Sequence, residues 1–331
     1  MPARPRRNPA RRGAALPAAG YHRPVILVAG ESLVDLIVEP DGGIRPSPGG
    51  GPFNAARTMS RLGQPVLFLG RFSADPFGAL LAARLREDRV QVAAPDPVPE
   101  PTALAVVALR EGGVAEYWFH LAGTAGLRLD LPAARRALAA GVSALHIGSL
   151  GLVAEPMAAG IERLVTEMPD AALLLLDPNC RPAVTPDPGG YRARIKRILP
   201  RADVVKASAE DLGFLVPRAS AEQAARGLLE AGAGCVLVTH GPDPVRAFAA
   251  AYELSVPVPP AAVADTVGAG DAFGGGFLAW WVEHALGRDR LADPGAVRAA
   301  LAAAARVAAL TVGKAGAEPP WRHELQPATR P

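Results

Sequence analysis

Short apolar runs alternate along the chain with longer stretches of helical periodicity. Each run leads into glycine or a polar residue, and the clearest five are residues 25–29, 145–147, 173–176, 204–206 and 236–238. The stretches between them, such as 133–140 and 221–231, are rich in Ala, Leu and Arg. Buried strands that alternate with helices predict an α/β fold: a doubly wound, mostly parallel sheet with helices on both faces. Such sheets bind ligands beyond the carboxyl ends of their strands, where these polar residues fall.

Two segments break this alternation and predict β-hairpins. Residues 36–48 carry Asp-Gly-Gly at 41–43, and residues 100–122 carry Glu-Gly-Gly at 111–113 between two apolar runs. Two inserted hairpins predict a small sheet that stands off the main body, although they could equally be surface decoration. Trp118 and Phe119 favour the first alternative, because exposed aromatic side chains usually have a partner.

The composition of the chain limits the number of domains and the class of protein. The chain has 331 residues, 50% hydrophobic and 20% charged, which suits one large or two smaller domains. No apolar run approaches the roughly 18 residues of a membrane span, so we expect no membrane contact. The cysteines, Cys180 and Cys235, form no Cys-x-x-Cys pair, which favours a reduced, cytoplasmic protein.

The positive charge of the chain is concentrated at one end. The net charge is +3, but residues 1–23 hold six arginines and no acidic residue, which leaves about −3 for the rest. The fold itself therefore has no basic excess, and we expect no nucleic-acid partner. Residues 1–22, rich in Arg, Pro, Ala and Gly, are expected to be a disordered basic tail, and residues 326–331 a C-terminal tail.

The strongest chemical signal is the sequence Ala-Asp-Thr-Val-Gly-Ala-Gly-Asp-Ala-Phe at 264–273. A glycine-rich turn precedes a predicted helix, so backbone N–H groups and the helix dipole can converge on an anion. A carboxylate beside an anion hole is what phosphoryl transfer to a hydroxyl requires. Glycines 274–276 would each cost about 1 kcal/mol within a helix, which indicates a close backbone approach there.

This segment resembles the C-terminal signature of the ribokinase-like (PfkB-type) sugar kinases, Asp-Thr-x-Gly-Ala-Gly-Asp-x-Phe. A second stretch, from Gly49 through Asn54 to Leu62 and Gly63, is similar to the N-terminal signature of that family. The resemblance covers about residues 24–325 and implies one kinase domain at 23–325, a ribokinase-like fold, with the two hairpins forming its β lid. The absence of a Gly-x-x-x-x-Gly-Lys-[Ser/Thr] sequence excludes a P-loop enzyme, and the absence of Asp-Phe-Gly excludes a protein kinase.

The resemblance implies roles for particular residues. Asp271 would take the proton of the acceptor hydroxyl, and Gly268, Ala269 and Gly270 would form the anion hole. The predicted sugar-binding residues are Asp35, Gly49, Gly50 and Asn54, with Arg181 as a ligand for phosphate or a substrate carboxylate. A bidentate carboxylate such as that of Asp35 suits a vicinal diol.

Further residues are implied for the nucleotide and its cations. Ser208 and Asp211 occupy the place of a family Asn-x-x-Glu that organises Mg²⁺ through water, here with the shorter acid. Thr239 and Gly241 resemble the nucleotide loop, which Pro242 and Pro244 would stiffen, and Gly268 and Gly270 would also contact the nucleotide. Asp265 and Val267 are candidates to hold a monovalent cation, K⁺. The expected cofactors are therefore ATP, Mg²⁺ and K⁺.

These observations together predict an ATP-dependent sugar kinase that transfers the γ-phosphoryl group to a hydroxyl, with fructose favoured. Segments at 117–125, 146–150, 177–182 and 203–212 resemble fructokinases in particular. The alternatives are 2-keto-3-deoxygluconate kinase, ribokinase, or a non-catalytic sugar- or nucleotide-sensing protein on the same fold. The only partner expected besides the small-molecule sugar is a second copy of the chain, in a homodimer formed through the lid sheet.

Overall fold

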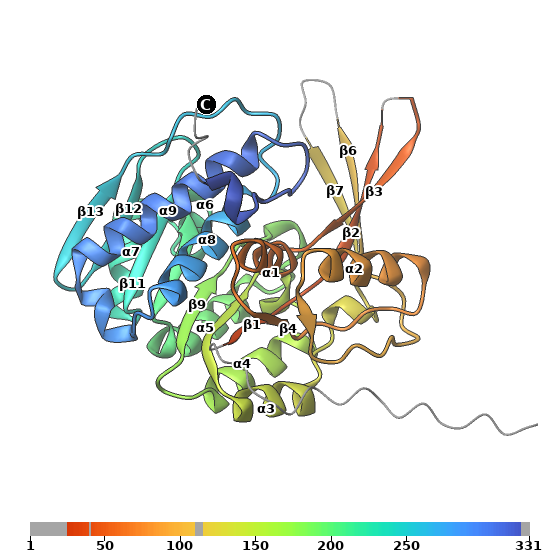
Figure 1. The fold of residues 1–331 in the computed structure, drawn as a ribbon, viewed down its shortest axis with the longest axis horizontal. Helices are drawn as coiled ribbons and strands as arrows, with labels where there is room; N and C mark the ends of the chain where they lie inside the picture. The colour runs from red at the N-terminus through yellow and green to blue at the C-terminus, as the bar shows by residue number, and fades with distance from the viewer. Residues whose placement is uncertain (1–24, 40, 110–114, 326–331) are drawn as a thin grey trace, which may run out of the picture.

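The computed structural model describes residues 25–39, 41–109 and 115–325. The predicted tails at 1–22 and 326–331 and the turn at 111–113 lie outside the described residues. A nine-stranded sheet forms the centre of the molecule (Figure 1). In spatial order it contains β13 (Tyr252–Val256), β12 (Val245–Ala249), β11 (Cys235–Thr239), β10 (Val204–Ser208), β9 (Leu173–Asp177), β8 (Val142–Gly148), β1 (Val25–Ala29), β4 (Val66–Phe68) and β5 (Gln91–Val92).

The strands pair in parallel from β11 to β5, and β12 and β13 add an antiparallel edge. Helices cover both faces, which confirms the predicted fold class. One face carries α3 (Leu131–Ala140), α4 (Met157–Glu167), α5 (Pro188–Ile198), α6 (Ala209–Leu215) and α7 (Ala221–Glu230). The other carries α1 (Gly51–Arg61), α2 (Pro76–Glu87), α8 (Ala269–Glu283) and α9 (Pro294–Val312). Short 3₁₀ turns include η2 (Ser149–Leu152) and η3 (Pro182–Val184).

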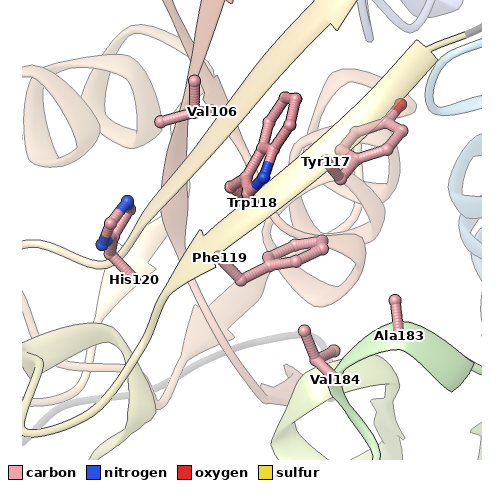
Figure 2. A pocket seen from close by; sticks show the side chains of 7 residues that line it. All are labelled: Val106, Tyr117, Trp118, Phe119, His120, Ala183 and Val184. Carbon is pink, nitrogen blue, oxygen red and sulfur yellow. The ribbon is translucent and has the colours of Figure 1, made fainter.

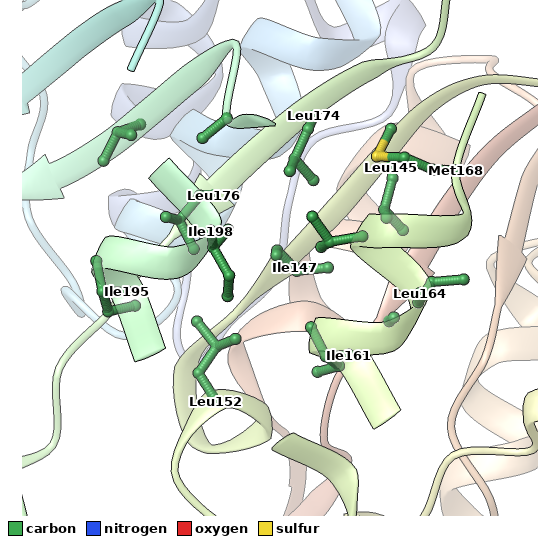
Figure 3. Packing of buried hydrophobic residues seen from close by; sticks show 14 of the residues in the cluster. Leu145, Ile147, Leu152, Ile161, Leu164, Met168, Leu174, Leu176, Ile195 and Ile198 are labelled. Atoms are coloured by element: carbon green, nitrogen blue, oxygen red, sulfur yellow. The ribbon is translucent and has the colours of Figure 1, made fainter. Parts of the chain in front are cut away.

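Burial on both faces explains why the strands read as unbroken apolar runs. Along β1, Val25 and Leu27 face the core beneath α3–α7, while Ile26 and Val28 face the core beneath α1 and α8. Figure 3 shows the first of these cores, in which leucines and isoleucines of β8 and β9 interdigitate with those of α4 and α5.

The two hairpins form a separate four-stranded sheet, as the sequence predicts. Its spatial order is β3 (Ile44–Gly49), β2 (Leu33–Val38), β6 (Leu104–Leu109) and β7 (Ala115–His120). Each hairpin is antiparallel, and the two are joined by parallel pairing of β2 with β6. This small sheet stands off one side of the main body (Figure 1). We call it the lid.

The glycines at 274–276 allow the close approach that the sequence predicts, and at two of them the neighbour is another helix. A Cβ added at Gly275 would lie 2.9 Å from Thr58 Cβ on α1, and one added at Gly276 would lie 3.1 Å from Val307 Cβ on α9. Helix α8 therefore packs closely between α1 and α9. This packing fixes the direction in which its N-terminus points.

Among the described helices, α9 is the one long and apolar enough to cross a membrane by length and composition. Core helices meet the same criterion. Val297, Leu301 and Val307 of α9 are buried in the core that also contains α8, and this packing is that of a core helix.

Candidate active site

The site is built around the N-terminus of α8. Gly268 caps this helix in a left-handed conformation (φ 77°), and a Cβ there would lie 2.6 Å from Ala317 Cβ. Only glycine satisfies both conditions. Because glycine has no side chain with which to cap, the N–H groups of the first turn are left for a ligand. The Ala269 N–H donates to Thr266 O over 3.3 Å, so Gly270 and Asp271 are better placed as donors than Ala269.

Asp271 lies in this first turn and unites the two signature motifs. It is buried, and its Oδ2 accepts a hydrogen bond from Asn54 Nδ2 at 3.0 Å, 217 residues away in the chain. Its Oδ1 accepts from Asn179 Nδ2 at 3.2 Å. Burial raises the pKa of Asp271, while the Asn54 hydrogen bond and the nearby charges of Lys206 and Arg181 oppose that rise. A carboxylate with a raised pKa beside an anion hole suits a general base.

Asp35 lies on lid strand β2 and not in a loop. A Cβ added at Gly49 would approach Asp35 Oδ2 to 2.5 Å, so the glycine on β3 makes room for this carboxylate. Burial raises the pKa of Asp35 to about 6, with Arg181 opposing the rise and Asp271 adding to it. The structure thus brings Asp35, Arg181 and Asp271 within electrostatic reach of one another, as the motifs predict.

Glu31, to which the sequence analysis gave no role, holds the backbone around Gly50. Gly50 has a φ of 113°, and the next residue, Gly51, starts α1. Glu31 is fully buried, and its two carboxylate oxygens accept from Gly51 N at 3.1 Å and Gly151 N at 2.9 Å. Glu31 therefore joins the start of α1 to η2. Its position directly after a buried strand was the available signal.

Lys206 and Asp177 were also missed as site residues. They come from adjacent strands, are 3% exposed each, and pair at 3.1 Å between Lys206 Nζ and Asp177 Oδ2. A Cβ at Gly270 would lie 2.9 Å from Lys206 Nζ, so this pair lies directly beneath the anion hole. The sequence showed Asp177 at the end of one apolar run and Lys206 within another, but not that both face α8.

Asp211, the acid of the Ser-x-x-Asp segment, has a structural role in this protein. Ser208 and Asp211 form a capping box at the start of α6, with 3.0 Å from Asp211 N to Ser208 Oγ and 2.8 Å from Ser208 N to Asp211 Oδ2. Asp211 Oδ1 also accepts from Cys180 N at 2.6 Å, which fixes the loop that carries Asn179 and Arg181. Both oxygens of Asp211 thus accept backbone hydrogen bonds.

The other predicted nucleotide and cation residues lie along the same edge of the sheet. Thr239 pairs with Ser208 at the ends of β11 and β10, and Gly241 follows in an exposed turn. The Asp265 carboxylate accepts from Val267 N at 3.0 Å and Gly316 N at 2.9 Å. The main-chain oxygens of Asp265 and Val267, more than the side chain, are therefore the atoms suited to a monovalent cation. Among the described residues no cluster of three or more His, Cys, Asp or Glu could hold a metal ion.

The lid adds aromatic side chains to the face that carries Asp35. Register places Asp35, Ala105 and Phe119 in one row across β2, β6 and β7, and Tyr117 stacks on Phe119 with ring centroids 5.9 Å apart. A cavity of about 510 Å³ is lined by four residues of β7, by Val106 of β6, and by Ala183 and Val184 of η3 (Figure 2). Burial and the charge of Asp35 raise the pKa of Tyr117. Neither Asp35 nor Asp271 lines this cavity, although the charge of Asp35 acts on Tyr117 in its wall.

A family comparison decides which protein class this geometry belongs to. Residues 26–324 match the pfkB family carbohydrate kinases. The chain belongs to this family. It is 34% identical over 262 residues to a fructokinase of Rhizobium leguminosarum bv. trifolii, which covers 77% of this chain and 79% of that protein. It is therefore an ATP-dependent carbohydrate kinase, as the motifs predict.

Solved structures agree with the fold. The fructokinase from Xylella fastidiosa with bound ATP superposes with a TM-score of 0.81 at 29% identity, covering 88% of this chain and 93% of that one. The fructokinase from Vibrio cholerae O395 in a form with fructose, ADP and calcium bound gives a TM-score of 0.77 at 27% identity, with 89% and 94% covered. The ribokinase-like fold and the sugar-kinase class of this chain are thereby confirmed.

Proposed function

We propose that this kinase transfers the γ-phosphoryl group of ATP to a hydroxyl of fructose, with Asp271 as the general base. One observation carries the mechanism: the Asp271 carboxylate lies at the open N-terminus of α8 while Asn54, from the other signature motif, holds it through a hydrogen bond. The phosphoryl group would lie against the N–H groups of Gly270 and Asp271, which stabilise charge that develops during transfer. The similarity to proteins named fructokinase supports fructose as the acceptor.

The acceptor sugar would lie between the lid and α1. Asp35 would accept hydrogen bonds from two neighbouring hydroxyls, and Gly49 and Gly50 let the backbone approach closely. Arg181 lies near both aspartates and would face either the sugar or a phosphate. Tyr117 and Phe119 would cover the apolar face of the ring from the lid.

Mg²⁺ and K⁺ are proposed as the cations. Mg²⁺ bound to the nucleotide phosphates would neutralise charge there. The chain would reach it through water from Asp211, since both oxygens of that carboxylate already accept backbone hydrogen bonds. The main-chain oxygens of Asp265 and Val267 would hold K⁺, and Ser208, Thr239 and Gly241 would line the nucleotide side.

An acceptor panel tests the proposal. ADP release is measured with fructose, ribose, 2-keto-3-deoxygluconate and adenosine at saturating Mg·ATP, and fructose is expected to give the highest kcat/KM. A different acceptor that is tenfold better would replace fructose and leave the kinase assignment in place. No ADP release above the ATPase background with fructose would contradict the proposed acceptor.

The lid-mediated homodimer and the cytoplasmic location stay predictions. Light scattering after size exclusion measures the oligomeric state.

A further inference from the structure

Three ionisable side chains from neighbouring strands lie under the first two turns of α8, against Gly270 and Gly274. They are His146 on β8, Asp177 on β9 and Lys206 on β10, and each is at most 3% exposed. Their sequence neighbours on these strands face the opposite core, so strand alternation turns all three toward α8. Buried charges stabilise a fold poorly even when paired. Two members of the row, Asp177 and Lys206, form a buried ion pair beneath the proposed base, and this pair calls for a functional explanation.

The Lys206 ammonium is enclosed between an acid and the backbone of the anion hole. Its Nζ lies 3.1 Å and 3.3 Å from the two carboxylate oxygens of Asp177. On another side is Gly270, where an added Cβ would lie 2.9 Å from Nζ. The chain has three lysines among 35 basic residues, so arginine is its usual cation. A compact ammonium fits this space, whereas a planar guanidinium is larger.

The charge states of the row leave a positive charge near Asp271. Burial alone would lower the pKa of Lys206, but Asp177, Asp211 and Asp271 outweigh it and the pKa is raised. Burial raises the pKa of Asp177, and the Lys206 ammonium, 3.1 Å away, opposes that rise and favours the ionised carboxylate. Burial and then the Lys206 charge lower the pKa of His146 to about 3, so this imidazole is neutral. Neither His146 ring nitrogen has a hydrogen-bond partner in the described part of the chain.

Several charged or titratable groups lie near Asp271, and each comes from a different part of the fold. They are Asp35 from β2, Asp177 from β9, Arg181 from the following loop and Lys206 from β10. The two aspartates disfavour ionisation of Asp271, and the two cations favour it. Arg181 is exposed, so solvent and salt screen its charge. Lys206 is buried, and its charge acts with little screening.

We propose that Lys206 is a positioning residue that keeps Asp271 ionised, and that Asp177 both anchors Lys206 and limits its effect. This inference rests on the role of Asp271 proposed above. When Asp271 accepts the proton of the sugar hydroxyl, the O–H bond breaks, the hydroxyl oxygen forms its new bond to phosphorus, and the bond from phosphorus to the ADP oxygen breaks. Lys206 exchanges no proton in this step. It sets the pH above which Asp271 can act.

Two variants with opposite expected effects test the proposal. Lys206→Met removes the positive charge, so the acid-side pKa of kcat should rise by at least about one unit. Asp177→Asn removes the neighbouring negative charge and keeps Lys206, so the same pKa should fall. A pair with only a structural role would not move the pH profile in opposite directions. Circular dichroism and thermal melting confirm that each variant is folded.

A second measurement avoids any dependence on the sugar. Carbon-13 NMR of the aspartate carboxyl groups in the unliganded protein follows Asp271 directly, with its signal identified by its loss in Asp271→Asn. If Lys206→Met does not fold, Lys206→Met/Asp177→Asn removes both charges and takes its place, and its Asp271 should titrate at a higher pH than in Asp177→Asn. Shifts of the same sign in both single variants, or an unmoved Asp271 signal once Lys206 is removed, would overturn the proposal. If no sugar is phosphorylated, the proposed function fails while the NMR titration still decides the role of Lys206.

Discussion

Replacing Gly49 by alanine should displace Asp35 without unfolding the protein. The new Cβ would lie 2.5 Å from Asp35 Oδ2, whereas ordinary contact begins at 3.4 Å. The carboxylate must therefore move by about 0.9 Å, a misplacement large enough to cost up to roughly 100-fold in rate at a reacting site. The backbone φ of Gly49 is compatible with alanine, and the atom that must yield is the end of a flexible side chain. Stability should therefore change little.

The expected loss falls on the sugar and not on the nucleotide. Asp35 is proposed to make two charge-assisted hydrogen bonds, each worth roughly 1.5–3 kcal/mol. Weakening both in part should reduce kcat/KM for the sugar by about 10- to 100-fold, or about 1.4–2.7 kcal/mol. Steady-state kinetics with each substrate varied in turn measure this, and the KM for ATP should stay within about twofold of the wild type. Gly213→Ala is the matched control, because an added Cβ there meets nothing within 4 Å.

A double-mutant cycle shows whether the effect passes through Asp35. Asp35→Asn and Gly49→Ala should be strongly non-additive, with the double variant no worse than Asp35→Asn alone. Additive losses would mean that the new methyl group obstructs the sugar directly, and the reasoning from the Asp35 contact would be refuted. A sugar kcat/KM within threefold of the wild type in Gly49→Ala would refute it as well.

Four other predictions follow from the same geometry. Asp271→Asn should lower kcat by about 10²–10⁴ with the KM for ATP retained, because a general base is lost; a variant that keeps more than a tenth of kcat contradicts this. The pKa of Asp35 is raised to about 6, so its carboxylate is ionised above that pH and protonated below it. The KM for the sugar should therefore rise as the pH falls through about 6. Asp35→Asn should abolish this pH-dependent rise in KM. Asp88→Ala removes the more deeply buried of the two acids that Arg57 and Arg61 share and leaves them only Glu318; it should lower the free energy of unfolding by about 3 kcal/mol in a urea titration. Deleting residues 1–22 should leave activity and Tm unchanged, and a large loss of either would show that the tail contributes to the folded enzyme.

Local patterns in the sequence were enough to predict the fold class, and they indicated candidate site residues that the structure brings close together. Uninterrupted apolar runs follow from burial on both faces of a parallel sheet, and the hairpins follow from alternation around Asp-Gly-Gly and Glu-Gly-Gly. That Asn54 and Asp271 serve one site was implied by the family resemblance, but the hydrogen bond between them was not predicted. In each case a short stretch of chain carries the information.

The missed residues act through contacts that no short stretch contains. Lys206 reads as one polar position in an apolar strand, and its proximity to Gly270 depends on how α8 packs on the sheet. The buried role of Glu31 depends on two N–H groups that lie 20 and 120 residues away. The edge strands β12 and β13 were not predicted either.

The anion hole itself depends on a part of the chain that no motif covers. Gly268 packs against Ala317, and Asp265 accepts a hydrogen bond from Gly316. That segment is held in turn by α1, because Arg57 Nη1 donates to Ala317 O at 2.8 Å. The helix that presents Asn54 to Asp271 thus also fixes the wall behind Gly268. The groups proposed for the sugar side and for the phosphate side both contact α1, an arrangement that suits the preorganisation on which electrostatic catalysis of phosphoryl transfer depends.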